Sequence, residues 1–282
     1  MKNELTNHIK NEIGKWHVIY SEDRKFIWLK NAKTAGTSMF RGVMLEEIDD
    51  VVSYKANPKE FDKWWDSLTD EKISEYFTFT FVRNPYDRLT SAFSHLVAEN
   101  NFELFARAWP VLNPKHEVPI GFSFNELYIQ FCLFVTRCLR YYDINDQSMY
   151  SGSSHWMPQS VYVETGGYQI VDFVGKYENL AADWKYVAKK IGVTEELPFK
   201  GASGTAQVLK KTREEIQGVP WAYYYIDFDI IDMVSEFYKR DLEILGYEEY
   251  TKLLKRSAHE AVEKDKMTKK ENKYRSEKYE IR

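Results

Sequence analysis

Cysteine is scarce in this sequence of 282 residues, which contains only Cys132 and Cys138. The two lie six residues apart in a stretch with helical periodicity, so their side chains would point to different faces of one helix. A disulfide between them is therefore not expected, and the composition is compatible with a reducing compartment. The sequence also lacks an Asn-x-Ser/Thr glycosylation site, which argues mildly against a lumenal protein.

Long hydrophobic runs are also missing. Phe131–Val135 spans five apolar residues, whereas a membrane-spanning helix needs about 20. The first residues, Met1–Thr6, lack the apolar core of a secretory signal. From these absences we expect no membrane span and a cytoplasmic location.

The net charge is small, −4, but it is unevenly distributed. Residues 251–282 contain 11 Lys and Arg against 6 Asp and Glu, a charge of +5, and residues 1–250 contain 28 against 37, a charge of −9. The body is not basic enough to suggest a nucleic-acid partner, so local groups must hold any bound anion. The charged C-terminal tail is either a solvated, partly helical extension or an arm that binds a partner.

Three strand–loop–helix units follow one another along the chain. Runs of apolar, β-branched and aromatic residues predict three strands, at 25–29, 76–82 and 171–177. Apolar residues at intervals of three or four predict a helix after each strand, at 39–48, 87–96 and 180–191, and Asn179 and Gly192 would cap the third helix at its two ends. This alternation predicts an α/β fold with a central parallel sheet flanked by helices, and a ligand at the carboxyl ends of the strands.

The remaining segments complete the expected organisation. We expect one domain at 25–250, an N-terminal extension at 1–24 and the charged tail at 251–282. Periodicity predicts two further helices, at Phe124–Leu139 and Asp229–Leu245. Three prolines predict an irregular insertion at 98–122, and Asp143–Gly167, which has no period, is expected to form an ordered loop.

The loop after the first predicted strand contains Lys33 together with small and hydroxyl residues. Thr37 or Ser38 can cap the helix that follows, and the N-terminus of that helix offers backbone N–H groups to an anion. A nucleoside-triphosphate P-loop needs its lysine after the second glycine, but Lys33 precedes Gly36, so that pattern fails. The loop is therefore either a different phosphate cradle or a plain turn with Lys33 exposed.

Arg83 ends the second predicted strand, and Ser91 follows eight residues later in the next helix. In a doubly wound sheet this strand end lies beside the first loop. A guanidinium and a hydroxyl would suit a second phosphate near the first. Alternatively, Asp87 and Arg88 draw Arg83 into a salt bridge at the start of the helix.

Five segments, in order, resemble motifs of the sulfotransferases that use 3′-phosphoadenosine 5′-phosphosulfate (PAPS), specifically of the carbohydrate sulfotransferase branch. Lys33–Ser38 is similar to their 5′-phosphosulfate loop, and Phe81–Phe93 is similar to their 3′-phosphate segment. The other three segments are Ser154–Gln159, Val171–Leu180 and Phe237–Tyr247. The resemblance covers about residues 25–247 and leaves out the tail and the insertion.

The resemblance implies a single P-loop-like domain that transfers a sulfuryl group from PAPS to a hydroxyl or amine, expected on a carbohydrate, without a metal. It implies that the 5′-phosphosulfate is bound by Lys33, Thr34, Ala35, Gly36, Thr37 and Ser38. Lys33 and the loop N–H groups would meet the charge on the leaving 5′-phosphate. Arg83 and Ser91 would bind the 3′-phosphate, and Tyr177 would contact the adenine.

A general base is needed because the acceptor hydroxyl loses a proton as it attacks. We expect His155, in the third matched segment, to be that base, although a histidine that only braces the loop would give the same pattern. Relatives that place a glutamate or histidine between the two phosphate motifs leave other candidates open. These are Glu46, Glu47 and Glu60, with His95 and His116 less favoured.

Two other functions remain open. Asp227 and Asp229 form a D-x-D that could hold Mn²⁺ in a nucleotide-sugar glycosyltransferase, but both precede a predicted helix, where aspartate commonly caps the N-terminus. A non-catalytic nucleotide- or glycan-binding module would keep the phosphate cradle and lack the base.

Overall fold

The computed structural model describes residues 4–98, 124–140, 154–198, 221–260 and 263. The predicted insertion at 98–122 lies outside these residues, apart from its first position. So do His116 and the first half of the predicted loop at 143–167.

A five-stranded sheet forms the centre of the molecule, in the order β3-β1-β2-β4-β7. The strands are β1 (Val18–Ser21), β2 (Phe26–Leu29), β3 (Val52–Ser53), β4 (Phe77–Val82) and β7 (Phe173–Lys176). Strands β2, β4 and β7 are the three predicted from the sequence, and they pair in parallel. The predicted parallel α/β sheet is confirmed, with one addition: β1 runs antiparallel to both β2 and β3.

Each parallel strand is followed by a helix, as predicted. After β2 come α2 (Gly36–Met39), a π-helical turn (Phe40–Met44) and α3 (Leu45–Glu47); after β4 comes α6 (Pro85–Ala98); after β7 comes α10 (Leu180–Ile191). Gly192 ends α10 in the left-handed conformation, as expected. Asn179 is the N-cap residue of α10, as expected, although its side chain makes no capping hydrogen bond and its amide donates to Asp183.

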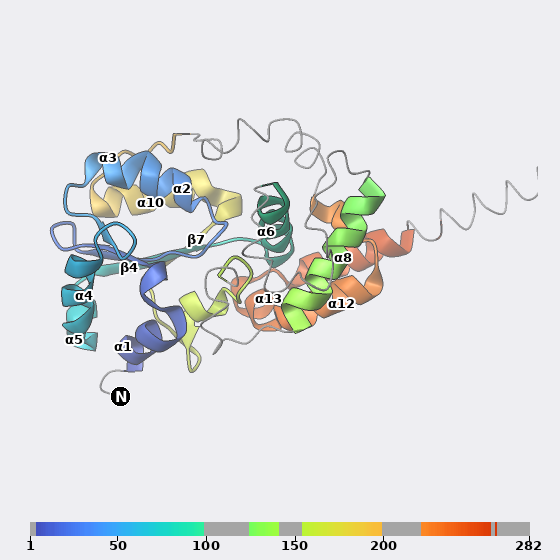
Figure 1. The fold of residues 1–282 in the computed structure, drawn as a ribbon, viewed down its shortest axis with the longest axis horizontal. Helices are drawn as coiled ribbons and strands as arrows, with labels where there is room; N and C mark the ends of the chain where they lie inside the picture. Colours follow the sequence, from blue (N-terminus) through green and yellow to red (C-terminus); the bar gives the residue numbers. More distant parts are fainter. Residues whose placement is uncertain (1–3, 99–123, 141–153, 199–220, 261–262, 264–282) are drawn as a thin grey trace, which may run out of the picture.

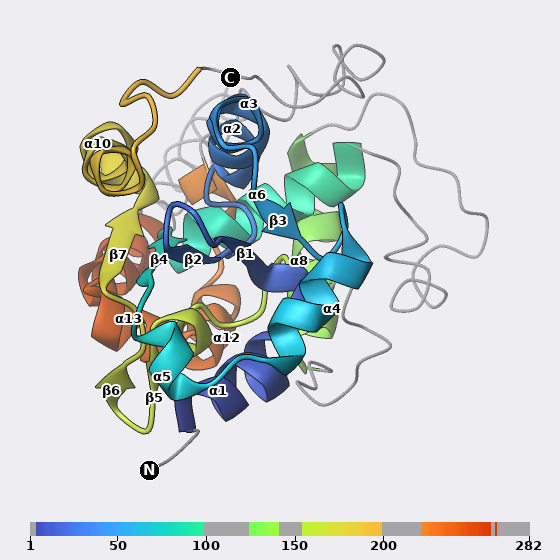
Figure 2. The same ribbon diagram turned by 90° about the vertical axis from the view of Figure 1, so that its left-hand side faces the viewer.

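The helices cover both faces of the sheet (Figure 1, Figure 2). Helices α2, α3 and α10 lie on one face, and the N-terminal elements and α4 and α5 lie on the other. These elements are α1 (Glu4–His8), a π-helical turn (Ile9–Ile13), a 3₁₀ turn (Lys15–His17), α4 (Pro58–Asp66) and α5 (Asp70–Ile73). Ile9 and Ile13 are buried beneath the sheet. Part of the segment assigned to an N-terminal extension therefore belongs to the sheet and its core.

A second group of helices packs beyond the carboxyl end of β4 (Figure 1). It contains α6, α8 (Phe124–Arg140), α12 (Phe228–Phe237) and α13 (Lys239–Leu245). The sequence predicted α8 correctly, but the single helix expected at Asp229–Leu245 is wrong, because it breaks at Tyr238. The Tyr238 side chain is buried, and its hydroxyl donates to the carbonyl of Trp156, which holds the chain at the break.

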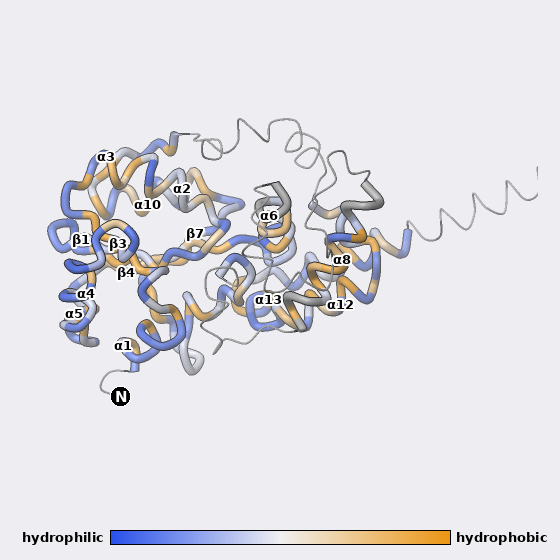
Figure 3. The backbone as a smooth tube through the Cα atoms, in the orientation of Figure 1, coloured by the Kyte–Doolittle hydropathy of each residue, from blue (hydrophilic) through white to orange (hydrophobic). Residues whose placement is uncertain are grey.

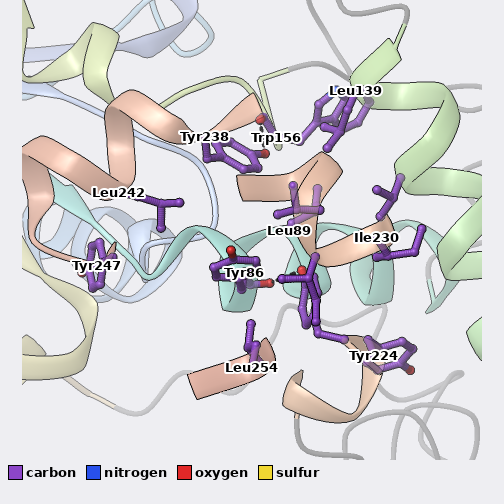
Figure 4. Packing of buried hydrophobic residues seen from close by; sticks show 14 of the residues in the cluster. Tyr86, Leu89, Leu139, Trp156, Tyr224, Ile230, Tyr238, Leu242, Tyr247 and Leu254 are labelled. Carbon is purple, nitrogen blue, oxygen red and sulfur yellow. Dashed lines mark hydrogen bonds between the residues drawn. The ribbon is translucent and has the colours of Figure 1, made fainter. Parts of the chain in front are cut away.

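This helical group surrounds an aromatic core of its own (Figure 4). Tyr86 and Leu89 of α6 belong to this core together with Tyr224 and Ile230. Residues 248–260 are helical, and two of their apolar side chains join the same core. The beginning of the predicted tail is therefore packed against the domain.

Hydrophobic residues concentrate along the strands and the helices that pack on them (Figure 3). The short remaining elements are two strands, β5 (Glu164–Thr165) and β6 (Tyr168–Gln169), and three 3₁₀ turns, Ser160–Tyr162, Tyr177–Asn179 and Trp221–Tyr224. Within the described part of the chain, every helix is too short or too polar to cross a bilayer.

Candidate functional site

The loop between β2 and α2 has an unusual backbone. Lys33 and Ala35 adopt positive φ angles of 68° and 66°, so the chain turns sharply before the helix begins at Gly36. The prediction that Thr37 or Ser38 caps this helix is wrong, because the N-cap is Ala35 and both hydroxyl residues lie inside the first turn. The Ser38 N–H donates to the carbonyl of Ala35 at 3.0 Å, which leaves the N–H groups of Gly36 and Thr37 at the open start of the helix.

Two buried side chains hold this loop in place. The Thr34 hydroxyl donates to the carbonyl of Asn31 at 2.9 Å, so it stabilises the turn. The Asn31 amide donates to the carbonyl of Phe81 at 3.2 Å and thereby joins the end of β2 to the end of β4. Lys33 itself is partly exposed.

Arg83 lies at the end of β4 and is held from three sides. Its Nε and Nη2 donate to the two carboxylate oxygens of Asp87 at 2.7 and 2.8 Å, which is the salt bridge considered as an alternative above. Its Nη1 donates to the carbonyl of Lys33 at 3.2 Å. The Tyr177 ring, after β7, lies 4.0 Å from the guanidinium carbon. Three consecutive strand ends therefore meet at one side chain.

Ser91 lies on α6, four residues after Asp87 and therefore on the same face of that helix. Its side chain is partly buried, but it makes no hydrogen bond with Arg83. The structure thus brings Lys33, Arg83 and Tyr177 into direct contact and places Ser91 on the adjoining helix.

The segment that contains His155 is fixed by a buried arginine, Arg88, for which the sequence suggests only a salt bridge at the start of α6. Arg88 is fully buried and donates to the carbonyl of Ala32 at 3.0 Å, to that of Met157 at 2.8 Å and to that of Ser154 at 3.3 Å. His155 is partly exposed, with its Nδ1 3.5 Å from the Ser154 hydroxyl. One guanidinium therefore joins the His155 segment to the loop that contains Lys33.

Asp241 of α13 provides a buried negative charge on the other side of this segment. Its two carboxylate oxygens accept the backbone N–H groups of Gln159 and Ser160 at 2.7 and 2.8 Å. Burial raises the pKa of Asp241, while these N–H groups and the charge of Arg88 oppose the rise. The sequence showed Asp241 only as part of a matched motif, and nothing in it indicated which groups the carboxylate would bind.

A comparison of the sequence with models of known protein families shows the family to which the chain belongs. The profile described as the sulfotransferase family matches residues 16–248. The chain belongs to the sulfotransferase family.

Two curated sulfotransferases are similar to it. Both are named carbohydrate sulfotransferase 11, one from Rattus norvegicus and one from Mus musculus. Each is 24% identical over 247 residues, which cover 82% of this chain and 67% of the relative. The comparison with solved structures gave no match.

The glutamates that remained open as bases lie away from the strand ends of this sulfotransferase. Glu47 accepts the N–H of Thr194, which follows the end of α10; because α10 begins after the carboxyl end of β7 and runs back, its own end lies toward the amino ends of the strands. Glu46 is its exposed neighbour on α3. Glu60 lies in the first turn of α4, where the side chain of Asn57 donates to it. His95 lies on α6, and the structure does not describe its side chain.

The D-x-D segment behaves as a helix cap. Asp227 is the N-cap of α12, and its carboxylate accepts the N–H of Asp229 at 2.8 Å. Among the residues that the structure describes, no three His, Cys, Asp or Glu side chains gather as they would around a metal ion. The feature that suggested a glycosyltransferase therefore has a structural explanation.

Proposed function

We propose that this sulfotransferase transfers a sulfuryl group from PAPS to a hydroxyl or amine of a carbohydrate acceptor. This proposal rests on the contact between two strand-end loops, the one after β2 that contains Lys33 and the one after β4 that begins at Arg83. Arg83 donates to the carbonyl of Lys33 and stacks on Tyr177. The two loops that would bind opposite ends of one bisphosphorylated adenosine are thus adjacent.

The 5′-phosphosulfate fits the loop of residues 33–38. The positive φ angles of Lys33 and Ala35 turn the backbone after β2, and the first N–H groups of α2 lie directly after this turn, where a helix N-terminus can bind an anion. The Lys33 ammonium and the N–H groups of Gly36 and Thr37 would stabilise the charge that develops on the leaving phosphate. In comparable oxyanion sites each well-aimed donor contributes about 2.7–4 kcal/mol.

The 3′-phosphate fits beside Arg83. An arginine has five N–H donors, and three of them bind Asp87 and the Lys33 carbonyl here. The other two N–H groups make no hydrogen bond within the described residues. They can donate to a phosphate, and the guanidinium that carries them is already oriented. Ser91, on the same face of α6 as Asp87, would add a hydroxyl donor, and Tyr177 would contact the adenine.

The chemistry is an in-line displacement. The acceptor oxygen forms a bond to sulfur while the bond from sulfur to the donor phosphate breaks, and His155 takes the proton that the acceptor loses. Lys33 and the helix N–H groups supply the positive charge that the leaving phosphate needs, so the proposal includes no metal. A carbohydrate acceptor is supported by the names of the two similar proteins.

Transfer of radiolabelled sulfate from PAPS to a panel of glycans, with EDTA present, tests this function. We expect at least one glycan to be labelled, and we expect labelling to be lost in Lys33→Ala. Binding of 3′-phosphoadenosine 5′-phosphate with no labelled acceptor would favour the non-catalytic module. Sugar transfer that requires Mn²⁺ and a sugar nucleotide would favour the glycosyltransferase and contradict the proposal.

A further inference from the structure

We propose that Gln159 is a positioning residue that sets the distance between the His155 segment and the donor-binding loops. The inference rests on the proposed function, because it concerns the same site. Gln159 is fully buried, and its carboxamide makes three hydrogen bonds to the two strand-end loops.

Two of these bonds fix Arg83 by its backbone. The Gln159 Nε2 donates to the Arg83 carbonyl at 2.7 Å, and the Arg83 N–H donates to Gln159 Oε1 at 2.9 Å. The side-chain amide therefore pairs with Arg83 as a neighbouring strand would, at the point where β4 ends. A carboxamide has both a donor and an acceptor, which this pairing needs.

The third bond reaches the other loop. Gln159 Oε1 also accepts from Asn31 Nδ2 at 2.9 Å, and Asn31 is the residue whose carbonyl receives the Thr34 hydroxyl. The Gln159 side chain thus contacts both Asn31, at the start of the loop that contains Lys33, and Arg83, which stacks on Tyr177.

The backbone of Gln159 is equally fixed. Its N–H donates to the buried carboxylate of Asp241, and Arg88 binds the carbonyls of Ser154 and Met157. The segment from Ser154 to Gln159 is therefore held at both ends, with His155 between them. A movement of Gln159 would shift His155 relative to Arg83 and Lys33.

Such a shift would affect catalysis more than folding. Misplacement of a reacting group by about 1 Å can reduce turnover by about 10²-fold. By contrast, loss of a buried hydrogen bond inside the sheet, away from the site, would affect stability alone. Thr80 offers that comparison: it is fully buried, and its hydroxyl joins β4 to β2 by donating to the carbonyl of Leu29 at 2.7 Å, which is a bond between two strands and not to either loop.

The experiment compares Gln159→Glu, Gln159→Met and Thr80→Val with the wild-type protein. Glutamate keeps the shape and the acceptor but cannot donate to the Arg83 carbonyl when ionised, and methionine removes all three bonds without adding a charge. We measure kcat, the KM of PAPS, the affinity for 3′-phosphoadenosine 5′-phosphate, the melting temperature and the pH profile of kcat.

We expect kcat to fall about tenfold or more in both Gln159 variants, with weaker binding of the bisphosphate, as follows from displaced catalytic groups. Thr80→Val should also lower the melting temperature, by less than Gln159→Met because it removes one buried hydrogen bond instead of three, and should keep kcat within about twofold. The ratio of Gln159→Glu to wild-type activity should rise at lower pH, because a protonated carboxyl regains a donor for the Arg83 carbonyl.

Folded Gln159 variants whose kcat and bisphosphate affinity match those of Thr80→Val would overturn the positioning role. If Gln159→Glu does not fold, Gln159→Met decides the question with the same measurements. Wild-type protein that neither binds the bisphosphate nor transfers sulfate would instead refute the proposed function, so the two failures are distinguishable.

Discussion

Arg83 shows how a single side chain organises the site. Asp87 binds two of its nitrogens, the Lys33 carbonyl binds the third, and Tyr177 covers its face. The Arg83 and Asp87 side chains are only 13% and 17% exposed, so solvent and salt screen this ion pair less than one on the surface. A guanidinium held in this way loses little side-chain freedom when a phosphate binds, and that favours donor affinity.

Lys33 and Arg83 should fail in different ways when replaced. We expect Lys33→Ala to lower kcat about 10²–10³-fold, because it removes charge stabilisation that develops only in the transition state. Arg83→Ala should mainly raise the KM of PAPS, because the 3′-phosphate is bound equally in ground and transition states. Steady-state kinetics with varied PAPS separates the two effects, and a Lys33→Ala enzyme with unchanged kcat would contradict the role of Lys33.

His155 should matter for proton transfer. His155→Ala should lower kcat by about 10²–10⁴-fold and flatten the acid side of the kcat profile. The matched control is His259→Ala, because His259 is exposed on the helix at 248–260 and should leave kcat unchanged. Wild-type turnover in His155→Ala would leave the histidine as a loop brace only.

At the scale of elements, the sequence predicts what has a clear period and misses what depends on pairing. The aromatic and β-branched run of β4 identifies a buried strand without further information. By contrast, β3 has only two residues, Val52–Ser53, and becomes a strand because it pairs with β1. The cap of α2 was missed for a similar reason, since Ala35 takes its left-handed conformation within a loop held by Asn31 and Thr34.

His17, which lies just before β1 and beside the end of β2, should make the protein sensitive to acid. Burial lowers the pKa of His17 to about 4, and the nearby charges of Lys30 and Arg88 add to this. In the unfolded chain His17 binds a proton near pH 6.5, whereas in the folded chain it does not. The contribution of His17 to the free energy of unfolding is therefore fully present above pH 6.5 and is lost as the pH falls towards 4. A shift of this size corresponds to about 3 kcal/mol at pH 4.

We expect His17→Gln to lose less stability than the wild type between pH 7 and pH 4. Denaturant unfolding at several pH values gives the comparison. Asp241, whose pKa is raised, contributes with the opposite sign as the pH falls, but it is present in both proteins and cancels in the difference. Equal pH dependence in the two proteins would show that His17 does not titrate in this way.

At the scale of the whole molecule, the sheet and the helical group meet at the site. Arg88 and Asp241 belong to α6 and α13 of the helical group, and they hold the loops at the strand ends. Short motifs in the sequence predicted that Lys33, Arg83 and Tyr177 belong to one site, and the structure places them in contact, while their roles toward a donor stay predictions. The sequence could not indicate Gln159 or Asp241 as partners, because their contacts join segments about 80 residues apart.

The helix at 248–260 should be required for stability, although part of it was assigned to the tail. Leu254 is 5% exposed in the aromatic core, whereas the adjacent Leu253 is 42% exposed. Leu254→Ala should therefore lower the free energy of unfolding by about 2–5 kcal/mol. Leu253→Ala should change it by less than about 0.5 kcal/mol. Denaturant unfolding of both variants gives the test, and equal losses would place the helix away from the core.

The central claim is that neighbouring strand ends hold the two phosphates of one adenosine derivative, and a crystal structure with 3′-phosphoadenosine 5′-phosphate tests it most directly. We predict the 5′-phosphate at residues 33–38 and the 3′-phosphate at Arg83 and Ser91, with the adenine against Tyr177. A ligand bound at any other part of the molecule, or rotated so that the 3′-phosphate lies at Lys33, would contradict the account.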